Sequence, residues 1–195
     1  MARDLVYFDL ETKRTANDVG GWHNKHEMGI SVAVTFSTKL GAYRIYTEDT
    51  VKDLIEQLRR ADLVIGFNHV QFDYGVLRGC VVLEFADQLE NLDLMLDLEK
   101  KIGHRPKLDA VASATLGAGK TADGLDAIRW WQQATQAKEK GDKQRWAERI
   151  GDIAHYCCHD VRATMRVHQY GCEHGHIKYL DRAQREQLIP VDWKL

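Results

Sequence analysis

The chain has 195 residues, of which 44% are hydrophobic and 29% charged, and its formal net charge is −2. This composition is typical of a folded globular protein and excludes a disordered or low-complexity chain. The nearly neutral charge gives no global sign of nucleic-acid binding, so any basic binding surface has to be local. No apolar run approaches the roughly 20 residues of a membrane span, and we expect no membrane contact.

The cysteines and the first residues indicate the cellular compartment. The four cysteines include no C-x-x-C pair, and the adjacent Cys157 and Cys158 are poor disulfide partners, which is typical of a reducing cytoplasm. The opening residues MARDLVYFDL lead directly into an apolar strand and lack the pattern of a signal peptide. We therefore expect a cytoplasmic protein. Because no repeat or Pro/Ser-rich linker marks a boundary, we expect residues 1–195 to form one domain.

Strand patterns dominate the first third of the chain. Residues 5–10 are apolar on both faces, as in a buried strand. Residues 30–37 and 42–46 are rich in β-branched and aromatic side chains, and the short turn between them predicts a hairpin. A helical pattern over residues 50–60 precedes a short apolar strand at residues 62–67.

Helical patterns dominate the rest of the chain. They predict helices at residues 71–79, 94–102, 107–116, 122–138 and 143–171. Because strand patterns come first and helical patterns follow, we expect an α/β fold in which helices flank a central mixed sheet.

Two acidic residues stand near the end of the first predicted strand. Asp9 and Glu11 are two residues apart, so their side chains leave the same face of the strand. Two neighbouring carboxylates repel each other. They are tolerated at a solvated strand end, and they are useful where a divalent cation lies between them. This pair by itself does not decide between the two.

A third acidic residue, Asp73, follows the second apolar strand. It comes after a loop at residues 68–71 and opens the next predicted helix. Helix capping and the helix dipole favour an aspartate there without any further function. If the two strands are neighbours in the sheet, however, Asp73 converges with Asp9 and Glu11 on one crevice.

A fourth acidic residue lies on the buried side of the last long helix. At 100° per residue, Asp160 falls within the apolar stripe that contains Ile153, Cys157 and Val161. Tyr156 lies one turn earlier on the same side, whereas His155 projects from the opposite, polar face. Because no arginine shares the face of Asp160, a bound metal is a good candidate to compensate its charge.

Three motifs occur in order along the chain. They are Asp9-Leu-Glu11-Thr12, Asn68-x-x-x-Phe72-Asp73 and Tyr156-x-x-x-Asp160. Together they resemble the motifs of the DEDD 3′–5′ exonucleases, a family with a ribonuclease H-like fold. The family has a tyrosine subclass and a histidine subclass. His155 fits the spacing of the histidine subclass, but the helix-face argument favours Tyr156 if the helix is already regular at His155.

The resemblance implies hydrolysis of terminal phosphodiester bonds in DNA or RNA, with release of nucleoside 5′-monophosphates. It implies that two divalent cations, Mg²⁺ or Mn²⁺, are bound by Asp9, Glu11, Asp73 and Asp160. Tyr156 is then expected to orient the attacking water. Two alternatives stay open: a catalytically silent module that binds nucleic acid or protein, and an endonuclease or oligoribonuclease on the same fold.

The same resemblance implies nucleic acid as the partner, in the form of single-stranded 3′ ends, with room for a helicase or polymerase that delivers them. Thr12 and Asn68 are expected to contact the substrate. Trp22, in the long loop after the first strand, either stacks on a base or anchors that loop. The basic residues Lys100, Lys101, His104, Arg105 and Lys107 either contact the phosphate backbone or form a solvated face.

Other motifs favour a structural interpretation. Residues 114–121 resemble a phosphate-binding loop but have alanine in place of the first glycine and no preceding strand, and Gly117 is expected to end a helix. The histidines and Cys172 of residues 168–176 lack the spacing of a zinc site. Asp93 is expected to be structural, and Cys157 belongs to the buried stripe and is an improbable nucleophile.

Overall fold

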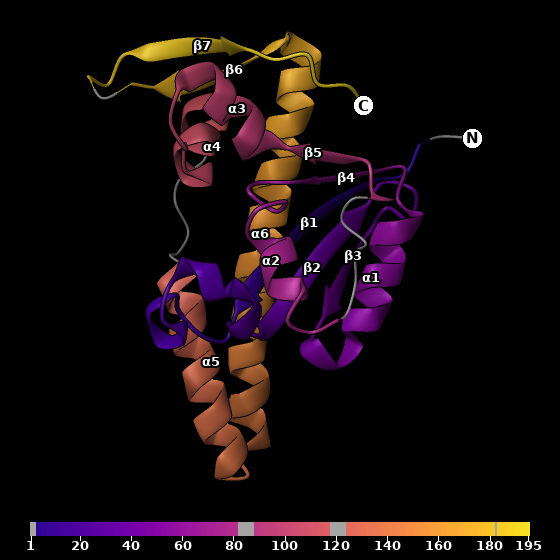
Figure 1. Ribbon diagram of the computed structural model, residues 1–195, viewed down its shortest axis with the longest axis vertical. Helices are drawn as coiled ribbons and strands as arrows, with labels where there is room; N and C mark the ends of the chain where they lie inside the picture. The colour runs from indigo at the N-terminus through magenta and orange to yellow at the C-terminus, as the bar shows by residue number, and fades with distance from the viewer. Residues whose placement is uncertain (1–2, 82–87, 118–123, 182) are drawn as a thin grey trace.

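The computed structural model describes residues 3–81, 88–117, 124–181 and 183–195. Its centre is a five-stranded sheet in the order β3-β2-β1-β4-β5 (Figure 1). The first three strands in the chain pair antiparallel, whereas β1 pairs parallel with β4 and β4 with β5, so the sheet is mixed, as predicted. The strands are β1 (Leu5–Thr12), β2 (Ile30–Ser37), β3 (Ala42–Tyr46), β4 (Leu63–Gly66) and β5 (Asn91–Asp93).

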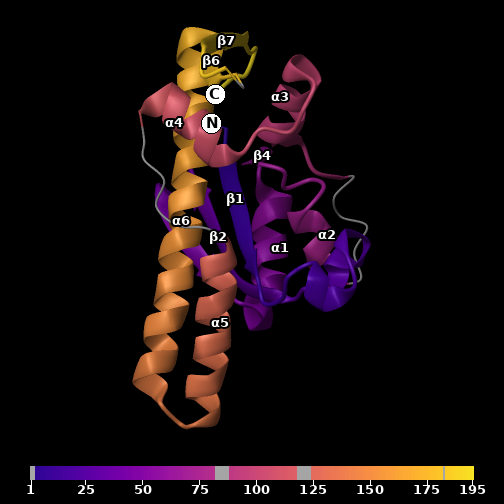
Figure 2. The ribbon, with the colours of Figure 1, turned by 90° about the vertical axis from the view of Figure 1, so that its left-hand side faces the viewer.

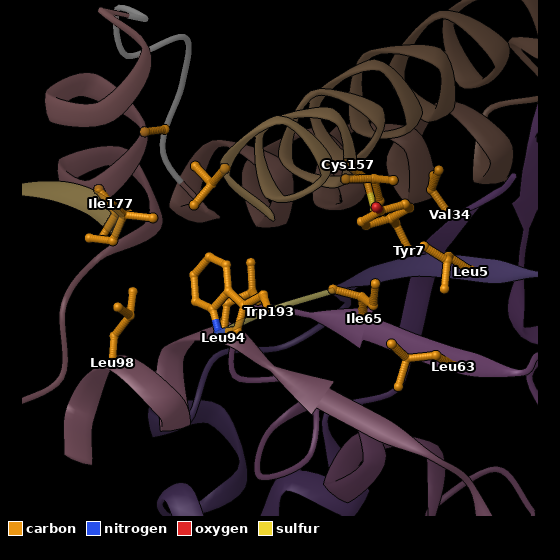
Figure 3. Close-up of a cluster of buried hydrophobic side chains, with 14 of the residues drawn as sticks. Leu5, Tyr7, Val34, Leu63, Ile65, Leu94, Leu98, Cys157, Ile177 and Trp193 are labelled. Atoms are coloured by element: carbon orange, nitrogen blue, oxygen red, sulfur yellow. The ribbon is translucent and has the colours of Figure 1, made fainter. Parts of the chain in front are cut away.

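The alternation of side chains along β1 gives the sheet two apolar faces. Leu5 and Tyr7 point to one face and pack with the long helix α6 (Lys143–His174), as Figure 3 shows. Val6 and Phe8 point to the other face and pack with α1 (Val51–Arg60) and α2 (Asp73–Leu77). Each fully buried side chain of this size contributes roughly 1.5–3 kcal/mol. Both faces are therefore covered, which explains why β1 is a continuous apolar run.

The longest element is α6, which runs across the sheet and pairs with α5 (Gly124–Glu139) beyond it (Figure 2). The side chain of Asp142 caps the start of α6 by accepting from the Arg145 N–H, and Gly175 ends it in the left-handed conformation. Gly151 does not interrupt the helix, so the helix is regular at His155. The predicted buried stripe of Ile153, Cys157 and Val161 is confirmed, and it continues through Thr164 and Val167.

The C-terminal part of the chain forms a hairpin that the sequence analysis did not predict. Strands β6 (His176–Leu180) and β7 (Glu186–Pro190) pair antiparallel beside α4 (Leu108–Leu116). Beyond them, the Trp193 indole donates to Asp97 of α3 (Leu94–Ile102) over 2.8 Å. Trp193 also packs so closely on Gly171 that a Cβ atom there would lie 2.5 Å from the ring. The hairpin and Trp193 thereby tie α3 and α4 to α6.

Most predicted elements are confirmed, with some differences. The helix expected at residues 71–79 is only α2, and the three-residue strand β5 was missed because it is too short to show periodicity. The long loop after β1 contains the 3₁₀ helices η1 (Asn17–Val19) and η2 (Trp22–Glu27), and η3 (Glu48–Thr50) precedes α1. Of the helix expected at 122–138, residues 122 and 123 lie outside the described residues. Among the described residues, no helix is long and apolar enough to span a membrane.

Candidate active site

The site begins at the C-terminal end of β1. Asp9 and Glu11 continue the alternation of Leu5 and Tyr7, and they therefore point to the face that α6 covers. Backbone pairing with Val34 and Val32 of β2 fixes this orientation. Both carboxylates are partly buried.

Asp160 joins these two residues from α6. Each of the three side chains offers one carboxylate oxygen, and these oxygens lie within 4.8 Å of one another. Among the described residues, this is the one group of three or more potential metal ligands. The helix-face argument thus predicted the correct side of α6.

Asp73 lies at the start of α2, as predicted, and is only 2% exposed. Its Oδ1 accepts the Leu10 backbone N–H over 2.9 Å, so the carboxylate is anchored to β1. Strand β4, which leads toward α2, pairs directly with β1. Asp73 lies outside the group of three oxygens but is near enough for its charge to raise the pKa of Asp9.

All four carboxyl groups have raised pKa values, and burial is the largest cause for each. It raises the pKa of Asp73 to about 8 and that of Asp160 to about 6. The pKa values of Asp9 and Glu11 are also well above their usual range, because repulsion from the neighbouring carboxylates adds to burial. Four crowded carboxylates offer the hard oxygen ligands that Mg²⁺ and Mn²⁺ prefer, so the residues fit divalent cations.

Tyr156 and His155 differ clearly in their surroundings. The Tyr156 side chain lies beside Asp160, close enough for each group to shift the pKa of the other, and its ring has an edge contact with Trp130 at 6.5 Å between centroids. Burial, followed by the neighbouring carboxylates, raises the pKa of Tyr156 far above its usual value, so the hydroxyl stays protonated. His155 is exposed to solvent. The structure therefore brings Tyr156, and not His155, to the acidic group.

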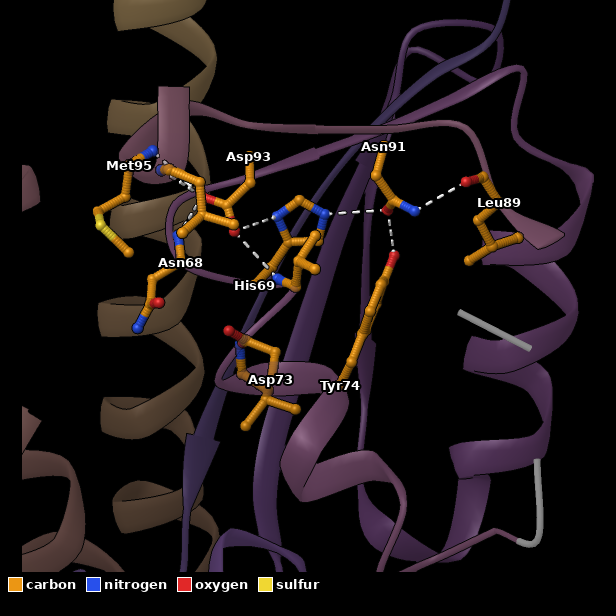
Figure 4. A network of polar contacts seen from close by, with 11 residues as sticks. Asn68, His69, Asp73, Tyr74, Leu89, Asn91, Asp93 and Met95 are labelled. Atoms are coloured by element: carbon orange, nitrogen blue, oxygen red, sulfur yellow. Dashed lines mark hydrogen bonds and ion pairs between the residues drawn. The ribbon is translucent and has the colours of Figure 1, made fainter. Parts of the chain in front are cut away.

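A polar network supports the loop before Asp73 (Figure 4). The Asp93 carboxylate accepts the backbone N–H groups of Asn68 and Val70 over 2.8 and 3.0 Å and also caps α3, which confirms its predicted structural role. Asn68 has a left-handed backbone with φ of 69°. Its side chain points away from Asp93 in Figure 4, and its Oδ1 is buried without a hydrogen-bond partner.

A cleft of about 490 Å³ adjoins the acidic group. Asp9, Glu11, Thr12 and Asp73 line it, and the Thr12 hydroxyl donates to the Arg14 carbonyl. Trp22 is 65% exposed at the cleft and meets Phe72 edge-on. The cleft is also lined by two residues that the sequence analysis did not single out, Leu125 and Ile128 of α5, whose i, i+3 apolar spacing was the available signal. Asn68 is not among the residues that line it.

The remaining candidate groups do not join the site. In the predicted basic cluster, Lys101 pairs with Asp97 and Arg105 with Glu99. From the long loop, the Lys25 ammonium donates to the Gln71 carbonyl over 2.7 Å.

At residues 168–176, His168 is buried in the core, and its Nδ1 lies 2.9 Å from the Tyr7 hydroxyl. Gly117 ends α4 in the left-handed conformation, as expected, and the rest of that glycine-rich motif, at 118–121, lies outside the described residues.

Comparison with known families decides the assignment, because the RNase H superfamily matches residues 6–171. The chain belongs to the RNase H superfamily. None of the curated proteins compared with it matches. The family B DNA polymerase of the archaeon Pyrobaculum calidifontis is similar in structure, with a TM-score of 0.58 and 13% identity over 88% of this chain and 25% of the polymerase. Exonuclease I is similar with a TM-score of 0.51 and 11% identity, over 88% of this chain and 41% of its own. At these identities the similarity shows a shared fold.

Proposed function

We propose that this superfamily member is a metal-dependent 3′–5′ exonuclease of the tyrosine subclass, which releases nucleoside 5′-monophosphates from DNA or RNA. The observation that carries the proposal is the convergence of Asp9, Glu11 and Asp160, with Tyr156 beside Asp160. This arrangement combines residues of β1 and α6 beside a cleft that Asp9 and Glu11 line. That a similar structure is an exonuclease by name agrees with the proposal.

Asp9, Glu11 and Asp160 would hold the cations, with Asp73 completing the set from the start of α2. Two bound Mg²⁺ or Mn²⁺ ions supply an activated water and stabilise the leaving oxygen of the phosphodiester. Bringing carboxylates together without cations is unfavourable, since repulsion from their neighbours adds to burial in raising the pKa values of Asp9 and Glu11. Repulsion among the carboxylates is therefore tolerated at the place where the cations would bind.

Tyr156 would position the attacking water. Since its hydroxyl stays protonated at neutral pH, it donates hydrogen bonds and does not act as a general base. Its proximity to Asp160 keeps the hydroxyl beside the acidic group. Positioning of this kind requires a rigid support, which the regular helix α6 provides.

The cleft fits an unpaired 3′-terminal nucleotide. Exposed Trp22 on η2 and Leu125 on α5 offer apolar surface for a base, and Thr12 lies on the cleft wall beside the acidic residues. Asn68 does not line the cleft, and an ordered water would satisfy its buried, unpartnered Oδ1 near the start of α2. The described surfaces specify neither a helicase nor a polymerase partner, and we propose none.

The test uses 5′-labelled single-stranded DNA and RNA with Mg²⁺, Mn²⁺ or EDTA, and compares the wild-type protein with Asp160→Ala. The expected result is a metal-dependent ladder that shortens from the 3′ end and is absent with the variant. A parallel strand with a blocked 3′ end separates exonuclease from endonuclease action. Cleavage of the blocked strand would overturn the exonuclease assignment, and binding without any cleavage would favour the silent module.

A further inference from the structure

Cys157 lies between two residues of the proposed site, one position after Tyr156 and three before Asp160. Its side chain is completely buried at the contact of α6 with β1. The Cys157 Sγ lies 3.3 Å from the Asp9 Oδ2 and 3.4 Å from the Asp9 backbone oxygen. These distances allow the S–H group to donate to Asp9, with its one proton shared between the two oxygens or directed to either.

This contact is distinctive because Asp9 has few other restraints. Among the described residues, Cys157 is the one hydrogen-bond donor to the Asp9 carboxylate. Without a donor, the carboxylate can rotate about the bond to its Cβ, since that torsion is broad. Repulsion from Glu11 and Asp73 would turn it away from the group.

We propose that Cys157 is a positioning residue of the metal site. Its S–H group holds the Asp9 carboxylate oriented toward the carboxylates of Glu11 and Asp160. The inference rests on the proposed function. Residues three apart on a helix lie about 60° apart around its axis, so one turn of α6 can direct Cys157 onto β1 and Asp160 to the edge of the cleft. The same turn therefore supplies one carboxylate and orients another that is 148 positions earlier in the chain.

The competing explanation is that Cys157 only fills space in the buried stripe. Cysteine often behaves as a small apolar residue, and packing would explain its burial equally well. Three variants distinguish these roles: Cys157→Val fills the space without a donor, Cys157→Ser keeps a donor, and Cys157→Ala has neither the donor nor the volume. If Cys157 only fills space, Cys157→Val should resemble the wild type more closely than Cys157→Ser. If Cys157 positions Asp9, Cys157→Ser should resemble the wild type more closely.

The experiment measures Mn²⁺ binding to each full-length protein by titration calorimetry in the absence of nucleic acid. Thermal unfolding in EDTA shows separately whether each variant is folded. We expect Cys157→Ser to bind Mn²⁺ within about threefold of the wild-type affinity. We expect Cys157→Val and Cys157→Ala to bind about 10- to 100-fold more weakly, as is typical when a group that orients a metal ligand is lost.

The outcomes separate this inference from the proposed function. If the wild type binds Mn²⁺ and Cys157→Val binds it equally well, the positioning role is overturned and the exonuclease proposal stands. If Cys157→Val does not fold, the comparison of serine with alanine decides, and equal affinities overturn the inference. If the wild type itself neither binds Mn²⁺ nor cleaves, both proposals fall together.

Discussion

Tyr156 lies beside Asp160, one turn further along α6, and the two groups shift the pKa values of each other. The pair combines the residue proposed to position water with a residue proposed to hold a cation. His155, the alternative from spacing, projects into solvent instead. This relationship leads to the first prediction.

Tyr156→Phe should lower kcat by about 10²-fold, because phenylalanine keeps the ring packing against Trp130 and removes only the hydroxyl. Single-turnover hydrolysis of a 3′-labelled oligonucleotide at saturating Mg²⁺ measures this directly. The control is His155→Ala, which should stay close to the wild-type rate. If His155→Ala lowered the rate more than Tyr156→Phe, the protein would instead be assigned to the histidine subclass.

The metal-free protein should become less stable as the pH rises from about 5 to about 8. A carboxyl group whose pKa is higher in the folded state than the usual value near 4 favours folding at low pH, and this contribution is lost as the pH rises through the folded-state pKa. For Asp160 and Asp73 the folded-state values are about 6 and about 8. We expect a loss of roughly 5 kcal/mol, measured by urea unfolding in EDTA.

Mg²⁺ or Mn²⁺ should reduce this dependence, since bound cations favour the charged carboxylates. The matched variant is Asp160→Asn, which removes one charge and should flatten the pH profile in EDTA. It should also show less stabilisation by metal than the wild type. Stability that rises with pH in EDTA, relative to Asp160→Asn, would contradict the raised pKa of Asp160.

His168 should contribute a pH dependence of opposite sign. Burial lowers the pKa of this histidine to about 4, below the usual value near 6.5, so its contribution to stability is present above pH 6.5 and is lost as the pH falls to 4. His168→Gln replaces it with a neutral group that can still bond the Tyr7 hydroxyl. The difference in free energy of unfolding between wild type and variant should shrink between pH 7 and pH 4.5. Because both proteins contain the same carboxylates, an unchanged difference would show that His168 does not titrate there.

Gly79→Ala should disturb the loop that carries Trp22. A Cβ atom at Gly79 would lie 1.7 Å from the His26 backbone oxygen, which belongs to η2. Backbone atoms yield less than side chains, so we expect destabilisation by about 1–3 kcal/mol and weaker binding of single-stranded oligonucleotide. Thermal unfolding and fluorescence anisotropy measure the two effects.

Gly151→Ala is the control for that substitution. Gly151 lies inside α6, and a Cβ atom there would meet no atom within 4 Å. Alanine should therefore stabilise the protein by about 0.5–1 kcal/mol through its higher helix propensity and leave hydrolysis unchanged. If Gly79→Ala instead keeps the stability and oligonucleotide binding of the wild type, η2 is free to move with respect to α2.

Local periodicity was sufficient for several features of the site. The two-residue repeat of β1 places Asp9 and Glu11 on one face, and the helical repeat of α6 places Asp160 in its buried stripe. The position of Asp73 at the start of a helix was likewise visible, because helix starts have a local signature. These predictions succeeded because each depends on residues within a few positions of one another.

Only the tertiary structure decided which of these faces meet. The packing of α6 across β1 brings Asp160 to Asp9 and seats Cys157 against the Asp9 carboxylate, while the Leu10 N–H anchors Asp73. The hairpin of β6 and β7 and the docking of Trp193 were also beyond prediction. Contacts between residues 63 to 148 positions apart depend on how two apolar faces fit together, and no period in the sequence encodes that fit.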